Sequence, residues 1–280
     1  MSRVPRHVRG SRLSLRGLVC TTVGVVLTVP LLASCGGASQ ASQRSEGSAQ
    51  AYHAAPLDIP KAATAPSCAA ALSSARSGPS YAAVVRKVAV VYSRPGGGNL
   101  IGRFGAVDQN GYSTVFGVVG RKNDGRCRPT WYHVQLPIMP NGSTGWVHAR
   151  SVRVYAVTSK IIVHLSTRRL VAYSAGKPVL RVPVAVGSSQ TPTPVGRFYI
   201  NERFILSNPN GPFGVAALGI SAHSNVLSDW VQGGPIALHG TDEPLSIGHA
   251  DSHGCVRLAN TDMRRLLTFA PAGTPVLIRR

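Results

Sequence analysis

Acidic residues are scarce in this 280-residue chain, which has 10 Asp and Glu against 30 Lys and Arg, and charged residues of either sign make up only 14% of it. This low charge content disfavours a helical bundle or a coiled coil. Internal repeats are absent from the sequence. The chain contains 30 Gly and 20 Pro, which punctuate strands and interrupt helices. With 44% hydrophobic residues it is not disordered throughout. The composition predicts a β-rich protein with one large domain or two modest ones.

The chain also lacks a hydrophobic run long enough to span a membrane. An apolar run from Leu18 to Leu32 follows five arginines, but its 15 residues fall short of the about 20 that a spanning helix needs. We interpret residues 1–34 as a signal peptide. Its end, Leu32-Ala33-Ser34-Cys35, resembles the lipobox of bacterial lipoproteins. That resemblance implies lipidation of Cys35 and anchoring to the outer face of the cytoplasmic membrane; an ordinary signal peptide with a coincidental cysteine is the alternative.

The expected export of the chain limits the partners that its positive charge can attract. Residues 1–34 contain five Arg and no acidic residue, so the remaining chain keeps a net charge of +15. Such a charge favours an anionic partner. An exported chain rarely meets nucleic acid, so we expect acidic wall polymers or anionic lipid headgroups, with simple solubility as the alternative explanation.

The 5 cysteines have different expected fates. Cys20 leaves with the signal peptide, and Cys35 is the lipidation candidate. Cys68 and Cys127 can pair in an oxidising compartment. Cys255 is then left without a partner, and an unpaired thiol in an exported protein is a candidate reactive group.

Two folded regions are expected after a tether. Residues 35–80 are rich in Ala, Ser, Gln, Gly and Pro and predict a flexible tether. Residues 81–157 contain short β-branched and aromatic runs between turn clusters, such as Val88–Tyr92 before Pro95-Gly96-Gly97-Gly98-Asn99. About five strands are expected there. The pattern, including Gly145-Trp146-Val147, resembles a small bacterial SH3-like β-barrel domain, which implies either binding of cell-wall peptides or a spacer role.

The region of residues 158–280 predicts a further set of strands around one helix. The helix is expected from Asn260 or Thr261, as the cap, to Phe269, before Pro271. The overall prediction is a mainly β protein whose last domain is a β-sandwich with one or two short helices. The strand candidates are Ile161–Leu165, Leu170–Tyr173, Val179–Val186, Phe198–Ile200, Ile236–His239 and Pro275–Ile278.

Reactive side chains are densest between His239 and Arg257. A cysteine attacks an acyl carbonyl as the thiolate, and a free thiol with a pKa of about 8.5 needs a nearby base to reach that form. Both His239 and His253 are candidate bases, and the residues alone leave the choice open. Gly254 permits a turn, and it also lets backbone N–H groups converge on a developing oxyanion. The alternative is that Cys255 is a small buried apolar residue beside a turn.

One short pattern is specific to a family. His239-Gly240-Thr241, Ile247-Gly248 and Ser252-His253-Gly254-Cys255-Val256-Arg257-Leu258 resemble the signature of the L,D-transpeptidase catalytic (YkuD) domain. Thr191-Pro192-Thr193-Pro194-Val195-Gly196-Arg197-Phe198 and Gly273-Thr274-Pro275-Val276 are similar to flanking segments of that family. Val195 departs from a commoner Thr, and Arg257 belongs to the Arg-ending version of the motif.

The resemblance implies a role for each matched residue. Cys255 is the nucleophile, His239 is the base, and the carbonyl of Gly240 orients the imidazole. His253 is a pocket residue, and the amides of residues 253–255, including Gly254, form the oxyanion pocket. Ser252 and Arg257 shape or polarise the site; hydrogen bonding that merely holds the loop is the alternative for these two.

The resemblance also implies the reaction. Cys255 attacks a peptidoglycan stem peptide, the terminal D-alanine leaves, and the thioester is opened by the side-chain amine of a neighbouring stem's third residue to give a 3-to-3 cross-link. No cofactor is expected, since one amide is exchanged for another. Water as the acceptor gives an L,D-carboxypeptidase, and the amine of another protein gives an anchoring transpeptidase.

Three readings from other classes compete with this one. A zinc site can be drawn from His239, His249, His253 and Cys255, but the paired short spacings of structural zinc sites are missing, so no metal is expected. A papain-like peptidase has its Cys before its His in the chain, the reverse of the order here. A noncatalytic wall-binding lipoprotein would fit a buried, unreactive Cys255.

Overall fold

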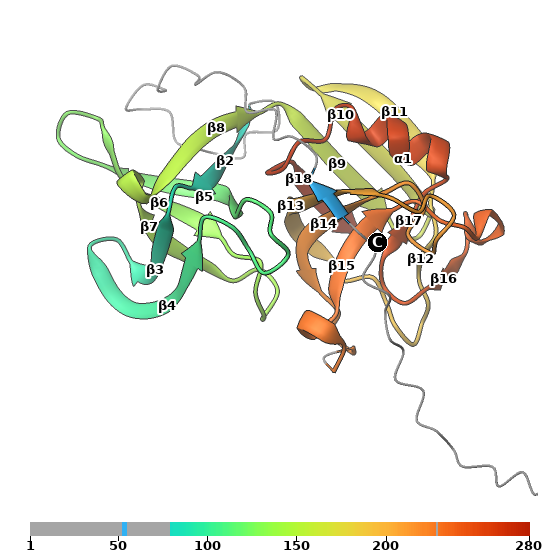
Figure 1. Ribbon diagram of the computed structural model, residues 1–280. Helices are drawn as coiled ribbons and strands as arrows, with labels where there is room; N and C mark the ends of the chain where they lie inside the picture. The colour runs from blue at the N-terminus through green and yellow to red at the C-terminus, as the bar shows by residue number, and fades with distance from the viewer. Residues whose placement is uncertain (1–51, 55–78, 228) are drawn as a thin grey trace, which may run out of the picture. The chain divides into compact units, whose positions relative to one another are not determined.

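A computed structural model describes residues 52–54, 79–227 and 229–280 of the chain (Figure 1). The predictions for the signal peptide, Cys35 and Cys68 lie outside these residues. Within them, two separate large sheets form, one from residues 80–157 and one mainly from residues 159–279. The helices found in the described ranges are too short or too polar to traverse a bilayer.

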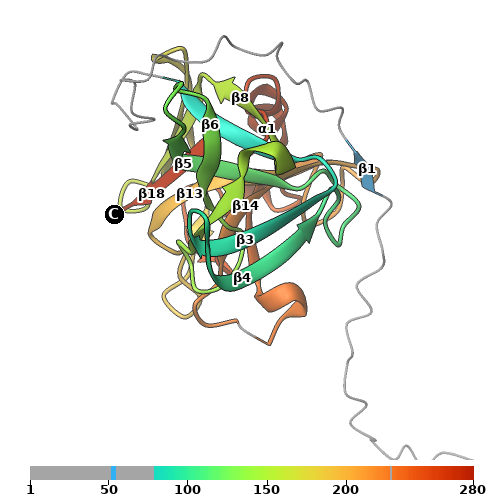
Figure 2. The same cartoon turned by 90° about the vertical axis from the view of Figure 1, so that its left-hand side faces the viewer.

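The N-terminal sheet is antiparallel, and its described strands follow the order β4-β3-β7-β6-β5-β2-β8. β3 and β7 alternate between buried and more exposed residues, as expected for an antiparallel sheet with one solvated face, whereas β2 carries four consecutive buried residues. The buried face forms a core around Val91, Phe116, Val134 and Val147. Figure 2 views the molecule from the side of this sheet. Its elements are β2 (Ser80–Val85), β3 (Val88–Arg94), β4 (Gly97–Gly105), β5 (Val115–Asn123), β6 (Pro129–Gln135), β7 (Thr144–His148), the 3₁₀ turn η1 (Ala149–Ser151) and β8 (Val152–Val157).

The second sheet continues from β9 to the C-terminal strand, with described strands in the order β11-β10-β9-β18-β13-β14-β15-β17. A separate pair, β12 with β16, runs parallel. The strands are β9 (Ser159–His164), β10 (Arg169–Ser174), β11 (Lys177–Pro183), β12 (Val186–Gly187), β13 (Gly196–Leu206), β14 (Ala216–His223), β15 (Pro235–His239), β16 (Ala250–Ser252), β17 (Val256–Arg257) and β18 (Pro275–Arg279). The helical elements are η2 (Val231–Gly233), η3 (Pro244–Ser246) and α1 (Asn260–Leu267).

The long strand β13 divides this sheet into two halves. Its first part pairs with β18, its later part pairs with β14, and its register shifts between Ile200 and Glu202. Apolar side chains from both halves meet in one core, for example Ile161 and Leu170 from one half and Leu218 and Leu238 from the other. The mainly β fold predicted from the sequence is confirmed, and the two packed halves agree with the expected β-sandwich.

Several elements differ from those expected. β4 begins at Gly97, inside the predicted turn, so the hairpin turn is shorter than the Gly-rich run suggested. β14 was not predicted, because its Ala-Ala-Leu-Gly start has little β-propensity. A short strand, β1 (Tyr52–Ala54), pairs with β13 inside the segment expected to be a tether.

The helix prediction needs one correction. Ala259 occupies the N-cap of α1, and Asn260, the predicted cap, is the first helical residue. The reason is that the Asn260 side chain bonds to backbone groups of two other segments rather than to its own helix.

Candidate functional site

His239 is the last residue of β15. Because side chains alternate in direction along a strand, it lies on the side of β15 opposite the main core. Ile236 and Leu238 point into the main core, so Ala237 and His239 face the opposite side of the sheet. The imidazole of His239 is nevertheless only 4% exposed. The ring of Phe213 covers it edge-on, with the ring centroids 4.9 Å apart.

The protonation state of His239 follows from its contacts. Nδ1 lies within hydrogen-bond distance of the Gly240 carbonyl oxygen, which can only accept, so Nδ1 carries the proton and Nε2 is left as the basic nitrogen. Burial lowers the pKa of His239 to about 4, and the charge of Arg257 adds to that effect, against the Gly240 hydrogen bond. The imidazole is therefore neutral at neutral pH.

Cys255 is held against the same strand. The Ala237 N–H donates to Cys255 Sγ at 3.4 Å, and the Cα atoms of Ala237 and His239 are about 6.7 Å apart along an extended strand. Cys255 is free of any disulfide, and as a residue it is neither fully buried nor exposed. Burial raises the pKa of Cys255, and the Ala237 N–H and the Arg257 charge oppose that increase. Both the thiol and the imidazole thus rest in their neutral forms.

Ser252 holds the loop that carries the thiol. Its hydroxyl donates to the Cys255 carbonyl oxygen at 2.5 Å and accepts from the Gly254 N–H at 3.2 Å. Thr191 reinforces the loop by donating to the Ser252 carbonyl oxygen at 3.1 Å. Gly254 has φ of +117°, a backbone conformation that glycine adopts without strain. Since the Gly254 amide is already used by Ser252, the amides of His253 and Cys255 are the remaining candidates for an oxyanion.

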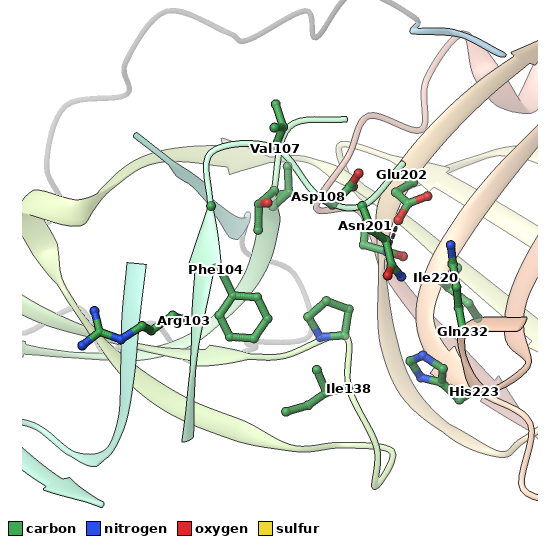
Figure 3. A pocket seen from close by; sticks show the side chains of 15 residues that line it. Arg103, Phe104, Val107, Asp108, Ile138, Asn201, Glu202, Ile220, His223 and Gln232 are labelled. Atoms are coloured by element: carbon green, nitrogen blue, oxygen red, sulfur yellow. Dashed lines mark hydrogen bonds between the residues drawn. The ribbon is translucent and has the colours of Figure 1, made fainter. Parts of the chain in front are cut away.

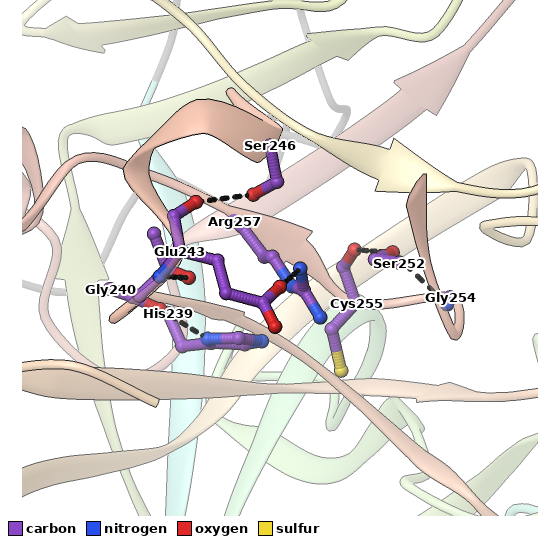
Figure 4. Close-up of polar contacts among 9 residues, drawn as sticks. His239, Gly240, Glu243, Ser246, Ser252, Gly254, Cys255 and Arg257 are labelled. Atoms are coloured by element: carbon purple, nitrogen blue, oxygen red, sulfur yellow. Dashed lines mark hydrogen bonds and ion pairs between the residues drawn. The ribbon is translucent and has the colours of Figure 1, made fainter. Parts of the chain in front are cut away.

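Arg257 brings a positive charge to both reactive groups. It is the register partner of His239 across the parallel pair of β15 and β17, and its charge lowers the pKa of both His239 and Cys255. Figure 4 shows its guanidinium in an ion pair with Glu243, a residue to which the sequence analysis gave no role. No local spacing signals this pair, because the two residues meet only through the loop after His239.

His253 lies at the rim of the site. It is exposed, and its ring lies against Trp230, with centroids 5.6 Å apart and a 35° angle between the planes. Trp230 is itself 53% exposed. The sequence analysis did not single out Trp230 or Phe213, since aromatic residues in loops carry no periodic signal.

Asn260 is another residue that the sequence analysis did not place in the site. Its Oδ1 accepts from the N–H groups of Val215 and Thr241 at 3.2 and 3.1 Å, and its Nδ2 donates to the Thr241 carbonyl oxygen at 3.1 Å. A Cβ on Gly240 would lie 2.1 Å from Asn260 Oδ1, so the backbone approaches this amide too closely for any other residue at that position. The amide therefore fixes the peptide that carries the His239 acceptor.

A cavity of about 360 Å³ opens between the two sheets, beside β14 (Figure 3). Glu202, one of its lining residues, is paired in register with Gly219, which is paired in turn with Ala237. Asn110 and Asn201 donate to the Glu202 carboxyl at 3.0 and 3.3 Å. Burial and the neighbouring Asp108 carboxylate raise the pKa of Glu202 to about 7.

The remaining predictions concern the other cysteines and a metal site. Cys127 forms a disulfide, but its expected partner Cys68 lies outside the described residues, so the pairing stays a prediction. Cys35 lies outside them too. In the part of the chain that the structure describes, no three His, Cys, Asp or Glu side chains gather in a metal-binding cluster.

Comparison with known proteins places this site in a family. The model of the L,D-transpeptidase catalytic domain (YkuD) matches residues 158–278. The putative L,D-transpeptidase YkuD of Bacillus subtilis (strain 168) is 36% identical over 126 residues, which cover 45% of this chain and 69% of that protein. The corresponding protein of Bacillus licheniformis is 39% identical over 119 residues, covering 42% of this chain and 64% of that protein.

The fold was also compared with solved structures. An L,D-transpeptidase from Mycobacterium smegmatis superposes with a TM-score of 0.38 and 13% identity, covering 71% of this chain and 99% of that one. The extent and identity of the sequence match to the Bacillus subtilis protein, together with the family model, show that the chain belongs to the L,D-transpeptidase catalytic (YkuD) domain family.

Proposed function

We propose that the protein is a peptidoglycan L,D-transpeptidase with Cys255 as its nucleophile and His239 as its base. One observation carries the proposal: Sγ of Cys255 is hydrogen-bonded to the strand that presents His239, whose Nδ1 is committed to Gly240 and whose Nε2 is the basic nitrogen. A free thiol and a neutral imidazole with an unprotonated Nε2, both held by one strand, are the groups that general-base activation of a thiol uses. Membership of the family supports transpeptidation as the reaction class.

The first half of the reaction is acylation. As Sγ attacks the carbonyl carbon that precedes the terminal D-alanine, His239 Nε2 takes the thiol proton. The carbon–nitrogen bond then breaks, and the imidazolium returns the proton to the departing amine of D-alanine. Because both groups start neutral, proton transfer accompanies the attack rather than preceding it.

The second half reverses these steps with another amine. The side-chain amine of a neighbouring stem's third residue attacks the thioester, His239 accepts the amine proton, and the thiolate leaves and is reprotonated. The product is a 3-to-3 cross-link. Arg257 adds positive charge beside the developing oxyanion, and Glu243 holds the guanidinium in place.

The wider setting of the enzyme is part of the proposal. An exported protein anchored through a lipid on Cys35 would face the wall, and the disulfide at Cys127 supports an oxidising compartment. The N-terminal sheet, with its own small core, is consistent with an SH3-like domain. We expect Cys35→Ala to move the protein from the membrane fraction to the soluble fraction of its host; an unchanged distribution would contradict lipid anchoring.

The activity is tested by product analysis. Purified protein is incubated with a stem tetrapeptide, with and without an amine-bearing acceptor stem, and the products are identified by mass spectrometry. We expect D-alanine release and a cross-linked dimer with the acceptor present. Release of D-alanine with tripeptide as the sole product would indicate a carboxypeptidase, and no turnover of any donor would contradict the proposal.

A further inference from the structure

Five aromatic rings share the solvent-facing side of the N-terminal sheet. We call them the ring face: Tyr92, Trp131, His133, Trp146 and His148. On the central strands, Tyr92 and His133 are both register partners of Trp146, and Trp131 is the partner of His148. In-register residues of adjacent strands point to the same side, so the five rings form one surface across β3, β7 and β6.

The rings of this surface pack on one another. Trp146 and His133 are stacked, with centroids 4.7 Å apart and planes 10° apart. Trp131 contacts His148 at 5.1 Å and Tyr92 at 6.1 Å, the latter edge-on. Every ring remains partly exposed. The opposite side of the same strands is the buried core of Val91, Val134 and Val147, so these rings are additional to the core.

An antiparallel sheet usually places polar side chains on its solvated face. Here two of the chain's 3 tryptophans lie on that face instead. A contiguous, partly exposed aromatic surface of this kind is typical of an interaction site. Tryptophan and tyrosine are also the residues that contribute most binding energy at such sites.

The electrostatics of the ring face restrict its partner. Lys122, which is exposed, is the register partner of Trp131, and Arg94 follows Tyr92 by two residues. Burial lowers the pKa of His133, and burial together with the Arg150 charge lowers that of His148, so both imidazoles stay neutral at neutral pH. β3, β6 and β7 contain no Asp or Glu. The surface is thus a neutral aromatic platform with a cationic rim.

We infer that the ring face binds the glycan strand of peptidoglycan. The negative faces of aromatic rings attract the slightly positive C–H groups on the flat side of a pyranose ring. β3 and β6 are separated by two inter-strand spacings, about 10 Å, which is wider than one sugar ring. The cationic rim complements the carboxylates of the stems that the strand carries. The choice of peptidoglycan as the polymer that is bound rests on the proposed function.

A peptide partner is less suited to this surface. Extended peptides dock in grooves or pockets that receive their side chains. Three cavities found in the described residues, of about 360, 170 and 440 Å³, are lined by residues outside the ring face.

The test measures binding by the full mature chain to two probes. One is insoluble purified peptidoglycan, and the other is a stem-free β-1,4-linked oligomer of N-acetylglucosamine, with binding followed by isothermal titration calorimetry. We expect Trp131→Ala with Trp146→Ala to weaken binding to both probes about tenfold, in line with the loss of one or two ring contacts. Tyr173→Ala, which removes a partly exposed ring from β10, is the matched control and should bind as the wild type does.

Two further measurements distinguish a loss of binding from a loss of folding or of catalysis. Trp131→Leu keeps apolar bulk without a ring, and it should also lose oligomer binding while its far-ultraviolet circular dichroism and melting temperature stay close to those of the wild type. Turnover of a soluble tetrapeptide should be unchanged in all these variants. That readout distinguishes failure of the ring face from failure of the proposed enzyme activity.

Several results would overturn the inference. The first is oligomer binding that is absent in the wild type or unaffected by the tryptophan variants. The second is binding to peptidoglycan that disappears when its stems or its acidic polymers are removed while the glycan stays intact. The third is competition by soluble stem peptides alone.

Discussion

At the residue scale, the reactive pair of Cys255 and His239 is neutral before substrate arrives. Burial moves the two pKa values in opposite directions, raising that of the thiol and lowering that of the imidazole to about 4. Proton transfer from thiol to imidazole is therefore unfavourable in the resting protein. A bound acyl donor changes this balance, because during attack the negative charge develops on the carbonyl oxygen rather than on sulfur.

The neutral pair predicts how Cys255 reacts with an alkylating agent. The rate of iodoacetamide labelling at Cys255, followed by peptide mass spectrometry, should keep rising with pH through and above the ordinary thiol range of about 8.5. No plateau should appear at lower pH. A plateau between about pH 5 and 8, typical of a thiolate–imidazolium pair, would contradict the neutral assignment.

The sequence was most informative at this scale. The motif that contains His239 and Cys255 could be found in the sequence because its residues occur at fixed, short spacings. Glu243 and Asn260 were not, because their roles arise from bonds to Arg257 and to backbone groups that are remote or irregularly spaced. A side chain that binds a backbone group leaves no complementary residue type in the sequence to search for.

At the scale of elements, the site is assembled where four segments meet. β15 supplies His239, the loop between β16 and β17 supplies Cys255, and the start of α1 supplies Asn260, which ties the residues after β15 to those before β14. Strand positions with β-branched residues were predictable. β14 was not, because its Ala-Ala-Leu-Gly start has little β-propensity.

Asn260 predicts a positioning effect on catalysis. Asn260→Ala leaves the N–H groups of Val215 and Thr241 without their acceptor, so we expect a loss of about 1 to 3 kcal/mol in the free energy of unfolding. The acylation rate should fall while the KM for the tetrapeptide changes little, since the residue orients His239 through Gly240.

The conservative variant distinguishes positioning from general stability. Asn260→Asp keeps the oxygen that accepts both N–H groups, but it replaces the donor to Thr241 with a carboxylate oxygen that faces the same carbonyl. It should therefore recover part of the acylation rate that Asn260→Ala loses. Equal loss of rate in both variants, or a loss confined to KM, would show that Asn260 does not act through the imidazole.

At the scale of the whole molecule, the two sheets are joined by specific contacts. The Tyr155 hydroxyl donates to the Ala272 carbonyl oxygen at 2.7 Å, and the Gln135 amide donates to the Arg197 carbonyl oxygen at 2.7 Å. Asp108 and Glu202 also meet across this boundary, although they lie far apart in the sequence. Sequence patterns predicted two β regions, but they carry no information on which surface of one contacts the other.

The Asp108–Glu202 contact predicts a pH-dependent stability. A folded-state pKa raised to about 7, above the ordinary value of 4.5, means that the folded protein holds a proton that the unfolded chain has lost. Its contribution to stability is complete below about pH 4.5 and is lost as the pH rises towards 7. The difference in unfolding free energy should be on the order of 3 kcal/mol.

The measurement compares urea unfolding of the wild type and Glu202→Gln from pH 4.5 to 8. His239 acts in the opposite direction, since its lowered pKa costs stability as the pH falls from 6.5 towards 4. The His239 contribution is common to both proteins and cancels in the difference. Stability of the variant relative to the wild type should increase with pH; a difference independent of pH would contradict the raised Glu202 pKa.

The central claim is that Cys255 forms a thioester with its acyl donor and that His239 is the base. Intact-protein mass spectrometry during a single turnover with a stem tetrapeptide tests it directly. The wild type should gain the mass of the donor less D-alanine, and Cys255→Ala should gain nothing while remaining folded. His239→Ala should acylate at least about a hundredfold more slowly than the wild type, and His253→Ala much less so. An adduct that persists on Cys255→Ala, or a larger loss of rate in His253→Ala than in His239→Ala, would contradict the account.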